Sequence, residues 1–418
     1  MKEKKKILVL SDSPLVPSGV GTQTKYVIDS LIKTGEFKFF CLAGAVRHQD
    51  YRIQKVQPYD TDWMILPVDG YGTQDLIRQL LREYKPDLIW FMTDPRFYVW
   101  LWEMENEIRK NVPMMYYHVW DNFPDPMFNK KYYDSNDIIC TISKVTDTIV
   151  KNVSPNVESV RIPHTVNPDI FCKKEEASDI QKRKMISSNN EKKTFFFWNN
   201  RNARRKQSGS LIYWFKDFLD IVGHDQAVLI MHTEPKDPNG QDLVAIMNNL
   251  GLTNGEVLIS EQKMSPEDLA CIYSAVDCTV NISDAEGFGL ATLESLACET
   301  PVIVSMTGGL QEQVTDGEQW FGYGIEPVSK AIIGSQDVPY IYEDRIDGAT
   351  FTNKLVEFHN LSKDQKAEMG KKGREHVLKN YGFEQFSKLW YETVTNTIEK
   401  HGSWEDRKNY KHWNFEEL

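Results

Sequence analysis

The segment from Asn281 to Ser305 reads NISDAEGFGLATLESLACETPVIVS, and it carries the signals of a strand end, a glycine turn, a helix and a second strand. Apolar side chains recur at helical spacing after Gly289, and Pro301 cannot continue a helix. Gly287 and Gly289 let the backbone approach a ligand closely. This order predicts an α/β fold in which free N–H groups at the helix start bind an anion.

Two carboxylates bracket the predicted anion site. Glu286 precedes the helix, and Glu294 lies about two turns further on, at 3.6 residues per turn. Carboxylates accept hydrogen bonds from hydroxyl groups. The pattern therefore suits a ligand with a central diphosphate and a hydroxyl-rich ring at each end, as in a nucleotide sugar. The alternative interpretation is an acidic loop followed by a solvated helix face.

The run from Glu286 to Ile303 resembles the Glu-x7-Glu signature of retaining GT-B glycosyltransferases, specifically glycosyltransferase family 4 (glycosyl transferases group 1). The resemblance implies an α/β, GT-B fold: two Rossmann-like, doubly wound domains facing a cleft, with a C-terminal helix crossing back to the first domain. It also implies that Glu286 is catalytic and contacts the sugar, and that Glu294 holds the ribose. The implied donor-binding residues of the turn are Gly287, Phe288, Gly289 and Leu290. Glu299 departs from the family, which commonly has glycine there.

Length and composition limit the class of protein. A chain of 418 residues predicts two domains, and 41% hydrophobic with 26% charged residues allows a buried core. The net charge of −11 gives no general basic surface for nucleic acid. Six cysteines without a C-x-x-C pair indicate reduced residues of a cytoplasmic protein. The lysine-rich start precedes too short an apolar run for a signal peptide or a transmembrane segment.

Strand-like and helical runs alternate in two parts of the chain, as in doubly wound domains. We predict an N-terminal, acceptor-side domain over 1–166, a polar linker over 167–193 and a C-terminal, nucleotide-sugar-binding domain over 194–382. The resemblance implies that 383–418 form a helix and tail packing back on the N-terminal domain. The predicted strands are 7–10, 39–42, 63–66, 88–91, 114–117, 138–142, 160–162, 194–198, 228–231, 257–259, 278–282 and 302–305.

A glycine pair follows the first predicted strand. Gly19 and Gly21 lie between that strand and its helix, where backbone N–H groups can meet a phosphate or a sugar. A plain tight turn explains the pair equally well. The position matches the glycine loop of the family, which implies that Gly19 and Gly21 contact the donor.

A cationic loop follows the first strand of the second domain. The sequence WNNRNARRKQ covers 198–207, and four cations within it suggest a focused anion site; a solvated loop is the alternative. The spacing resembles the G-R-x4-K-G element of the family, with Asn200 in place of the glycine. On that resemblance Arg201 and Lys206 are catalytic: they hold the diphosphate and stabilise the charge on the leaving group.

Three further motifs are weaker. His118, in YYHVWD, is either a core histidine or, on the resemblance, the catalytic-site histidine that contacts the donor sugar. The segment 161–167 resembles the family's hinge. Gly308 and Gly309, with Glu312, resemble its supporting glycine element.

No metal site and no cofactor are expected. Asp60 and Asp62 form a D-x-D pair of the kind that holds a divalent metal in the other major glycosyltransferase fold, but here we interpret them as turn residues. The His and Cys residues lack zinc spacing. The ligand expected is the substrate itself, a UDP- or GDP-linked sugar.

The preferred hypothesis is a retaining, metal-independent hexosyl- or glycosyltransferase that moves a sugar from a nucleotide-diphosphate sugar to an acceptor hydroxyl. The acceptor is predicted to be a glycan or a lipid-linked glycan. The alternatives are a nucleotide-sugar epimerase or hydrolase, a non-catalytic nucleotide-sugar-binding subunit, and a phage-type glycosyltransferase that modifies DNA. The net charge disfavours nucleic acid as a partner.

Overall fold

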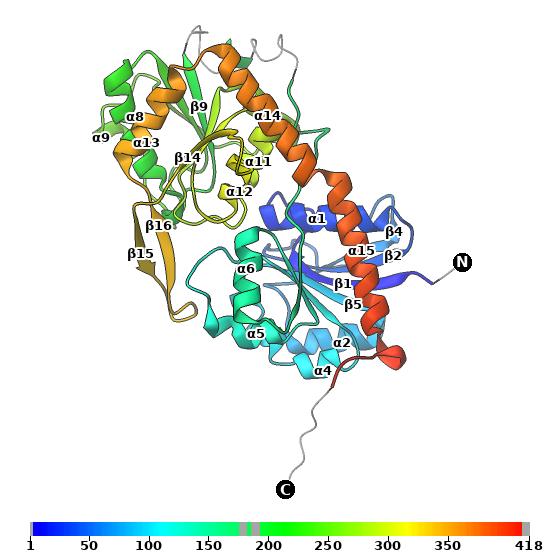
Figure 1. The fold of residues 1–418 in the computed structure, drawn as a ribbon. Coiled ribbons are helices and arrows are strands. Elements are labelled where there is room, and N and C mark those ends of the chain that lie inside the picture. Colours follow the sequence, from blue (N-terminus) through cyan, green and yellow to red (C-terminus); the bar gives the residue numbers. More distant parts are fainter. Residues whose placement is uncertain (1–2, 175–181, 185–192, 412–418) are drawn as a thin grey trace. The chain divides into compact units, whose positions relative to one another are not determined.

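The structure is a computed structural model that describes residues 3–174, 182–184 and 193–411. It divides into two compact units (Figure 1). Unit 1 comprises Met1–Thr165, Gln336–Pro339 and Glu384–Leu418, and unit 2 comprises Val166–Ser335 and Tyr340–Phe383. Most of the predicted linker 167–193 lies outside the described residues, so this prediction and the predicted domain boundaries stay predictions.

Unit 1 is built on a sheet with the strand order β3-β4-β2-β1-β5-β6-β7-β8, parallel except for the β3–β4 pair (Figure 1). Its strands are β1 (Lys5–Asp12), β2 (Phe37–Gly44), β3 (Gln54–Val56), β4 (Asp60–Pro67), β5 (Leu88–Met92), β6 (Met114–His118), β7 (Ile138–Thr141) and β8 (Glu158–Arg161). Its helices are α1 (Gly19–Ile32), α2 (Gln74–Tyr84), α3 (Val99–Trp102), α4 (Glu105–Arg109), α5 (Lys130–Asp134), α6 (Lys144–Val153) and α15 (Phe383–His401).

The terminal helix α15 belongs to unit 1 from its second residue, Glu384, onward, as the fold prediction required. Trp390 of α15 is fully buried and packs edge-on against Trp90 and Tyr117, with ring centroids 5.9 and 4.8 Å apart. Apolar residues at helical spacing therefore cover the sheet of unit 1.

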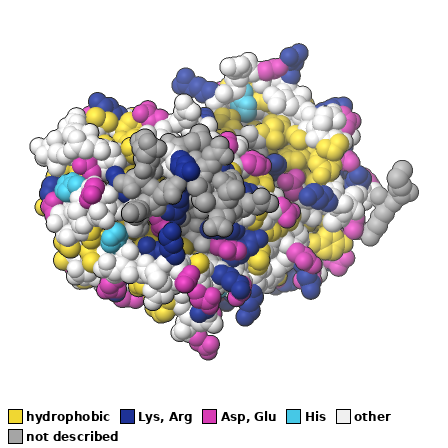
Figure 2. All heavy atoms as spheres, turned by 90° about the horizontal axis from the view of Figure 1, so that it is seen from above, with side chains coloured by type: hydrophobic (Ala, Val, Ile, Leu, Met, Phe, Trp, Pro, Cys, Tyr) yellow, Lys and Arg dark blue, Asp and Glu magenta, His cyan; other side chains and the backbone are white. Residues whose placement is uncertain are grey.

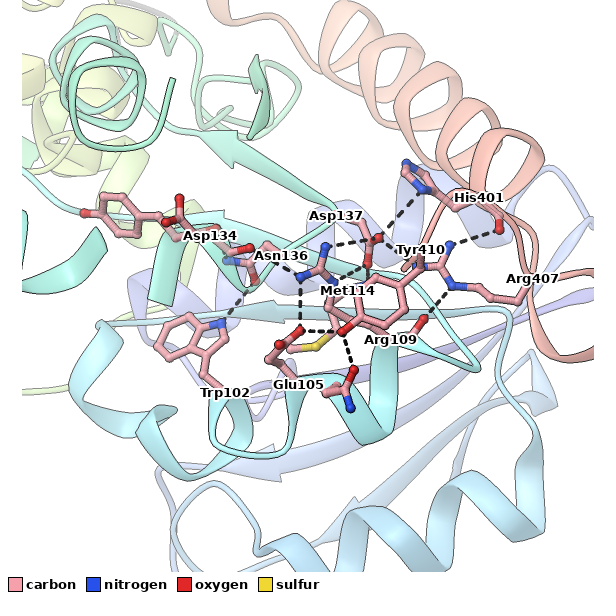
Figure 3. A network of polar contacts seen from close by, with 12 residues as sticks. Trp102, Glu105, Arg109, Met114, Asp134, Asn136, Asp137, His401, Arg407 and Tyr410 are labelled. Atoms are coloured by element: carbon pink, nitrogen blue, oxygen red, sulfur yellow. Dashed lines mark hydrogen bonds and ion pairs between the residues drawn. The ribbon is translucent and has the colours of Figure 1, made fainter. Parts of the chain in front are cut away.

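The buried Asp137 carboxylate binds the segment that follows α15 (Figure 3). Asp137 accepts hydrogen bonds from Arg407 at 2.8 Å and from Arg109 at 3.1 Å. The Tyr410 ring lies over the guanidinium groups of Arg109 and Arg407. These charge-assisted contacts fix the segment 407–410 on unit 1.

Unit 2 has a parallel sheet with the order β11-β10-β9-β12-β13-β14 and a separate antiparallel ribbon, β15–β16 (Figure 1). Its strands are β9 (Thr194–Asn199), β10 (Ala227–His232), β11 (Val257–Ser260), β12 (Cys278–Asn281), β13 (Val302–Ser305), β14 (Gly322–Ile325), β15 (Ser329–Ile333) and β16 (Ile341–Arg345). Its helices are α8 (Ser208–Val222), α9 (Leu243–Asn249), α10 (Pro266–Ala275), α11 (Leu290–Ala297), α12 (Gln311–Val314), α13 (Gly348–His359) and α14 (Lys363–Tyr381).

Every predicted strand is present, and one sequence interpretation is corrected: the helical stretch predicted near 100–109 is broken into α3 and α4. Asp60 closes the turn before β4, as expected, because it has φ +48° and the Asp62 N–H donates to the Tyr59 carbonyl at 2.9 Å. The Asp60 and Asp62 carboxylates pair with Lys55 and Lys4. All six cysteines are free thiols. Among the described residues, no helix is both long enough and apolar enough to cross a membrane.

Candidate active site

The strand order of unit 2 reverses beside its first strand. The chain runs outward from β9 to β10 and β11, then returns to place β12 on the other side of β9. In open parallel sheets, ligands bind at the carboxyl ends of the strands at such a reversal. The loops after β9 and β12 meet there, since the Asp284 N–H donates to the Arg205 carbonyl at 2.8 Å. The predicted basic loop and the predicted glutamate turn are therefore neighbours.

Lys206 and Glu286 form a buried ion pair between these two loops. Only 8% of the Lys206 side chain and 12% of the Glu286 side chain are exposed. Burial raises the pKa of the Glu286 carboxyl, but the charges of Lys206 and Arg205 outweigh it and hold the pKa below its usual value. Glu286 is therefore an anion at neutral pH, and Lys206 is its counter-ion.

Arg201 has a different environment from Lys206. Its guanidinium donates to both carboxylate oxygens of Asp237 at 2.6 and 3.0 Å, while 64% of its side chain is exposed. These hydrogen bonds lower the pKa of Asp237 to about 2. Asp237 thus fixes one side of the guanidinium and leaves the exposed side available to an anion.

The glycine turn brings backbone to the start of α11. Gly289 has φ +92° and precedes the helix without any side-chain cap, so the first amides of α11 are not used by a capping side chain. A Cβ on Gly308 would lie 1.9 Å from the Glu286 carbonyl oxygen, and the Gly309 N–H donates to that oxygen at 3.0 Å. Gly308 and Gly309 therefore support the turn by close backbone packing.

Phe288 and Leu290, two neighbouring predicted donor-binding residues, have different environments. The Phe288 ring is buried and packs edge-on against Tyr381, with centroids 5.7 Å apart, and its carbonyl accepts from Gln313 at 2.7 Å. Leu290 is the first residue of α11 and offers a backbone amide at the helix start. Phe288 therefore anchors the turn.

Glu294 lies one turn along α11 from Leu290 and faces the end of β9. Its carboxylate accepts a hydrogen bond from the Tyr273 hydroxyl at 2.9 Å. The Tyr273 hydroxyl oxygen in turn accepts a hydrogen bond from the Asn199 side-chain amide at 2.9 Å. Burial raises the pKa of Glu294 from 4.5 to about 7, although the Tyr273 hydrogen bond favours the ionised form. The two glutamates consequently differ in charge near neutral pH.

We expect Glu294 to make stability depend on pH. The folded-state pKa of Glu294 lies above its ordinary pKa of 4.5, so protonation of this carboxyl stabilises the folded state fully below pH 4.5. That stabilisation is lost as the pH rises through the folded-state pKa of about 7. Glu294→Gln cannot ionise. Its Tm relative to the unmodified protein should therefore rise by a few degrees between pH 5 and pH 8, measured by thermal unfolding.

A second variant checks the assigned cause. Tyr273→Phe removes the hydrogen bond that favours the ionised carboxylate, so it should shift the pH response to higher pH. The same Tm difference for Glu294→Gln at both pH values would contradict the assignment.

Unit 1 holds the other predicted residues. Its strand order reverses between β1 and β5, and the loop after β1 leads to Gly19 and Gly21 at the start of α1. A Cβ on Gly21 would lie 2.6 Å from the Ser13 carbonyl oxygen, so glycine is required there by close packing. Ser18 caps α1 by accepting from the Gly21 N–H.

His118 ends β6 and is fully buried. Its Nε2 lies 2.6 Å from the Tyr133 hydroxyl, while Nδ1 is buried without a hydrogen-bond partner among the described residues. Burial lowers the pKa of His118 to about 3, so the imidazole is neutral at pH 7. The predicted contact of His118 with a sugar stays a prediction.

The predicted hinge segment is held on α1 at its end. Gln23 donates to the Thr165 carbonyl at 2.8 Å and accepts from the Thr165 N–H at 3.1 Å, and the two units divide directly after this residue. His164 of this segment is buried, with Nδ1 2.8 Å from the Tyr117 hydroxyl.

Sequence reasoning missed several residues around the site. Asp237 and Glu343 hold Arg201 and Arg204, and Arg345 pairs with Asp284 at 2.5 Å. These partners lie far from the motifs along the chain, so no local pattern pointed to them. The one local signal is the strongly charged strand IYEDR over 341–345.

Residues 179–336 match the sequence model of the family described as glycosyl transferases group 1. Among curated proteins, the D-inositol 3-phosphate glycosyltransferase of Mycobacterium sp. (strain KMS) is 40% identical over 76 residues, 18% of this chain and 17% of the relative. The match thus spans less than a fifth of that relative's length.

Two solved structures resemble nearly the whole chain. Sucrose-phosphate synthase from Thermosynechococcus elongatus has a TM-score of 0.74 at 17% identity, covering 95% of this chain and 100% of its own. Anabaena HepE in complex with UDP-glucose has a TM-score of 0.68 at 16% identity, covering 94% and 99%. These neighbours confirm the predicted GT-B fold class, and the group 1 match falls on the unit that contains the Lys206–Glu286 pair.

Proposed function

We propose that this protein is a retaining glycosyltransferase that moves a sugar from a nucleoside-diphosphate sugar to an acceptor hydroxyl. The observation that carries the proposal is the buried Lys206–Glu286 pair, placed between the loops at the strand-order reversal and beside the uncapped start of α11. The group 1 match over 179–336 and the UDP-glucose in the similar HepE structure support a nucleotide-sugar donor.

The chemistry proposed is electrostatic. When the bond between the anomeric carbon and the diphosphate oxygen breaks, negative charge develops on the leaving diphosphate. Lys206, the exposed side of Arg201 and the amides at Gly289 and Leu290 would stabilise that charge. Glu286, held ionised, would accept hydrogen bonds from the sugar, and Glu294 from the ribose. The acceptor hydroxyl oxygen bonds to the anomeric carbon on the face that the diphosphate leaves, and its proton passes to the departing diphosphate oxygen.

The acceptor is proposed to be a glycan or a lipid-linked glycan. An open hollow on the surface of unit 1 is lined by seven residues, four of which have hydrogen-bonding side chains: Arg47, His48, Tyr51 and Asp69. Tyr51 is 53% exposed and donates to Asp69 at 2.5 Å. An exposed aromatic ring beside planar polar groups suits a sugar ring.

On the face that Figure 2 draws, Lys and Arg side chains are interspersed with Asp and Glu, which disfavours nucleic acid there.

The test is an incubation with UDP- and GDP-linked sugars, with no acceptor, with glycan or lipid extracts, and with DNA. Release of nucleotide diphosphate that requires an extract is the expected result. Release without an extract would favour a hydrolase, an altered donor sugar would favour an epimerase, and binding without turnover would favour a non-catalytic subunit. Transfer to DNA alone would replace the proposed acceptor.

Transfer is expected to continue in excess chelator. Lysine, arginine and helix amides provide the positive charge that the leaving diphosphate needs, so the proposed mechanism requires no divalent ion. Turnover measured in excess EDTA should match turnover measured with added Mg²⁺. A complete loss that Mg²⁺ restores would contradict the metal-independent mechanism.

A further inference from the structure

The antiparallel ribbon β15–β16 lies outside the parallel sheet of unit 2, and its base reaches the loops that form the candidate active site. The group 1 match ends at residue 336, before β16 begins at Ile341. The contacts of β16 are therefore a feature that the family match does not describe.

Glu343 of β16 is a buried carboxylate that holds two arginines. Its two oxygens each accept from one terminal nitrogen of Arg204 at 2.7 Å, and Arg345 donates to it at 3.2 Å. Only 2% of the Glu343 side chain is exposed. Burial raises the pKa of Glu343, but the hydrogen bonds and charges of Arg204 and Arg345 outweigh it and lower the pKa. The forked pair joins β16 to the basic loop with a defined geometry.

Asp284 connects the ribbon to the glutamate turn. Its carboxylate pairs with Arg345 at 2.5 Å and accepts from Gln207 at 2.6 Å. Its carbonyl accepts from the Asp344 N–H at 2.9 Å, and its own N–H donates to Arg205 at 2.8 Å. The start of the turn is thus held from the ribbon and from the basic loop, two residues before Glu286.

The ribbon also reaches the glycine turn after β13. Thr307 donates to the Asp344 carboxylate at 2.7 Å. The adjoining Gly308 and Gly309 pack closely against the Glu286 carbonyl. The base of one ribbon, Glu343–Arg345, therefore contacts all three loops around the Lys206–Glu286 pair.

We propose that Glu343, Asp344 and Arg345 are positioning residues that brace the three loops of the donor site. The expected effect of these residues on turnover rests on the proposed function. Their expected effect on the stability of the loops does not. Electrostatic stabilisation of a leaving group requires charges that are already in place, because reorientation during the reaction costs free energy. The ribbon supplies this preorganisation through charged hydrogen bonds rather than through contact with substrate.

The structural test uses hydrogen exchange on Glu343→Gln and Arg345→Gln, with Lys330→Gln as a control on the exposed strand of the same ribbon. We expect the Asp284 amide to exchange about tenfold faster in the first two variants, because local opening becomes easier. The Thr279 amide, which donates to Pro301 in the central sheet, should not change. Unchanged exchange at Asp284, or equal acceleration at Thr279, would overturn the proposal.

The catalytic test measures nucleotide release by the same variants. Glu343→Gln and Arg345→Gln should lower kcat about tenfold, with less effect on KM for the donor, while Lys330→Gln keeps both. The double variant Arg204→Gln with Glu343→Gln should lose no more than the worse single variant, because the two side chains act as one unit. Additive losses, or normal kcat in both ribbon variants, would overturn the positioning role. If the unmodified protein releases no nucleotide, the proposed function is wrong. The hydrogen-exchange experiment then tests by itself whether the ribbon braces the three loops.

Discussion

Replacing Lys206 with methionine is expected to lower sugar turnover by roughly a hundredfold. Methionine keeps much of the length of the side chain but removes the charge that faces Glu286 and the proposed diphosphate. The buried Glu286 carboxylate then lacks its cation, so the protein should also lose about 3–5 kcal/mol of stability. Nucleotide release at saturating donor and chemical denaturation measure the two effects separately.

A double variant separates catalysis from folding. Lys206→Met combined with Glu286→Gln removes both charges of the pair, and replacing both partners of a buried ion pair is often close to neutral for stability. Stability should return while turnover stays low. Recovery of turnover along with stability would contradict a catalytic role for Lys206. Lys216→Met, which breaks a more exposed pair with Asp220 on α8, is the control for removal of one lysine.

Arg201 should respond differently from Lys206. Because 64% of its side chain is exposed, Arg201→Met should lower stability less than Lys206→Met does and act mainly on turnover. The buried Asp237 carboxylate that loses this arginine still accepts from the Asn239 N–H at 2.8 Å. From sequence the two residues looked equivalent, since both fall in one cationic loop. In the structure they differ because Lys206 is buried and Arg201 is exposed. The partner of the buried Lys206 is Glu286, which lies 80 residues away in the sequence, so the local pattern could not show this difference.

The parallel strands were predictable because local patterns specify them. Buried strands such as Leu88–Met92 are continuous apolar runs, which only a sheet covered on both faces accommodates. The place of the basic loop beside the glutamate turn was predictable through the family motifs. Periodicity could not predict the order of the strands, because it carries no information on which strands are neighbours.

The ribbon β15–β16 was not predicted, for a physical reason. Its strands lie outside the main sheet and are mostly half-exposed, so their sequences are only partly apolar: β15 ends in the short run AII and β16 is IYEDR. The buried position of Glu343 depends on Arg204, 139 residues earlier in the chain. A charged residue that is buried through a distant partner looks like a surface residue when only its neighbours in sequence are considered.

The second large effect is expected from the two glutamates, which the proposal assigns to opposite ends of the donor. Glu294→Gln should weaken binding of both free nucleotide diphosphate and intact donor by about tenfold or more, because the charge-assisted hydrogen bonds to ribose are lost. Glu286→Gln should spare the nucleotide diphosphate. Without the Glu286 carboxylate, the Lys206 ammonium loses its counter-ion, and its charge becomes fully available to the diphosphate.

Calorimetric titration of both variants, with nucleotide diphosphate and with donor, tests this division. The titrations belong at pH 8, because the pKa of Glu294 is about 7 and the unmodified carboxylate must be ionised for the comparison. Between pH 8 and pH 6 the unmodified protein should lose more affinity for nucleotide diphosphate than Glu294→Gln does, because the ligand phosphate titrates with both proteins but Glu294 titrates in only one. Turnover of Glu286→Gln should fall by tens to hundreds of times, since its hydrogen bonds to the sugar strengthen as the bond to diphosphate breaks. Equal weakening of nucleotide binding in the two variants would rule this assignment out.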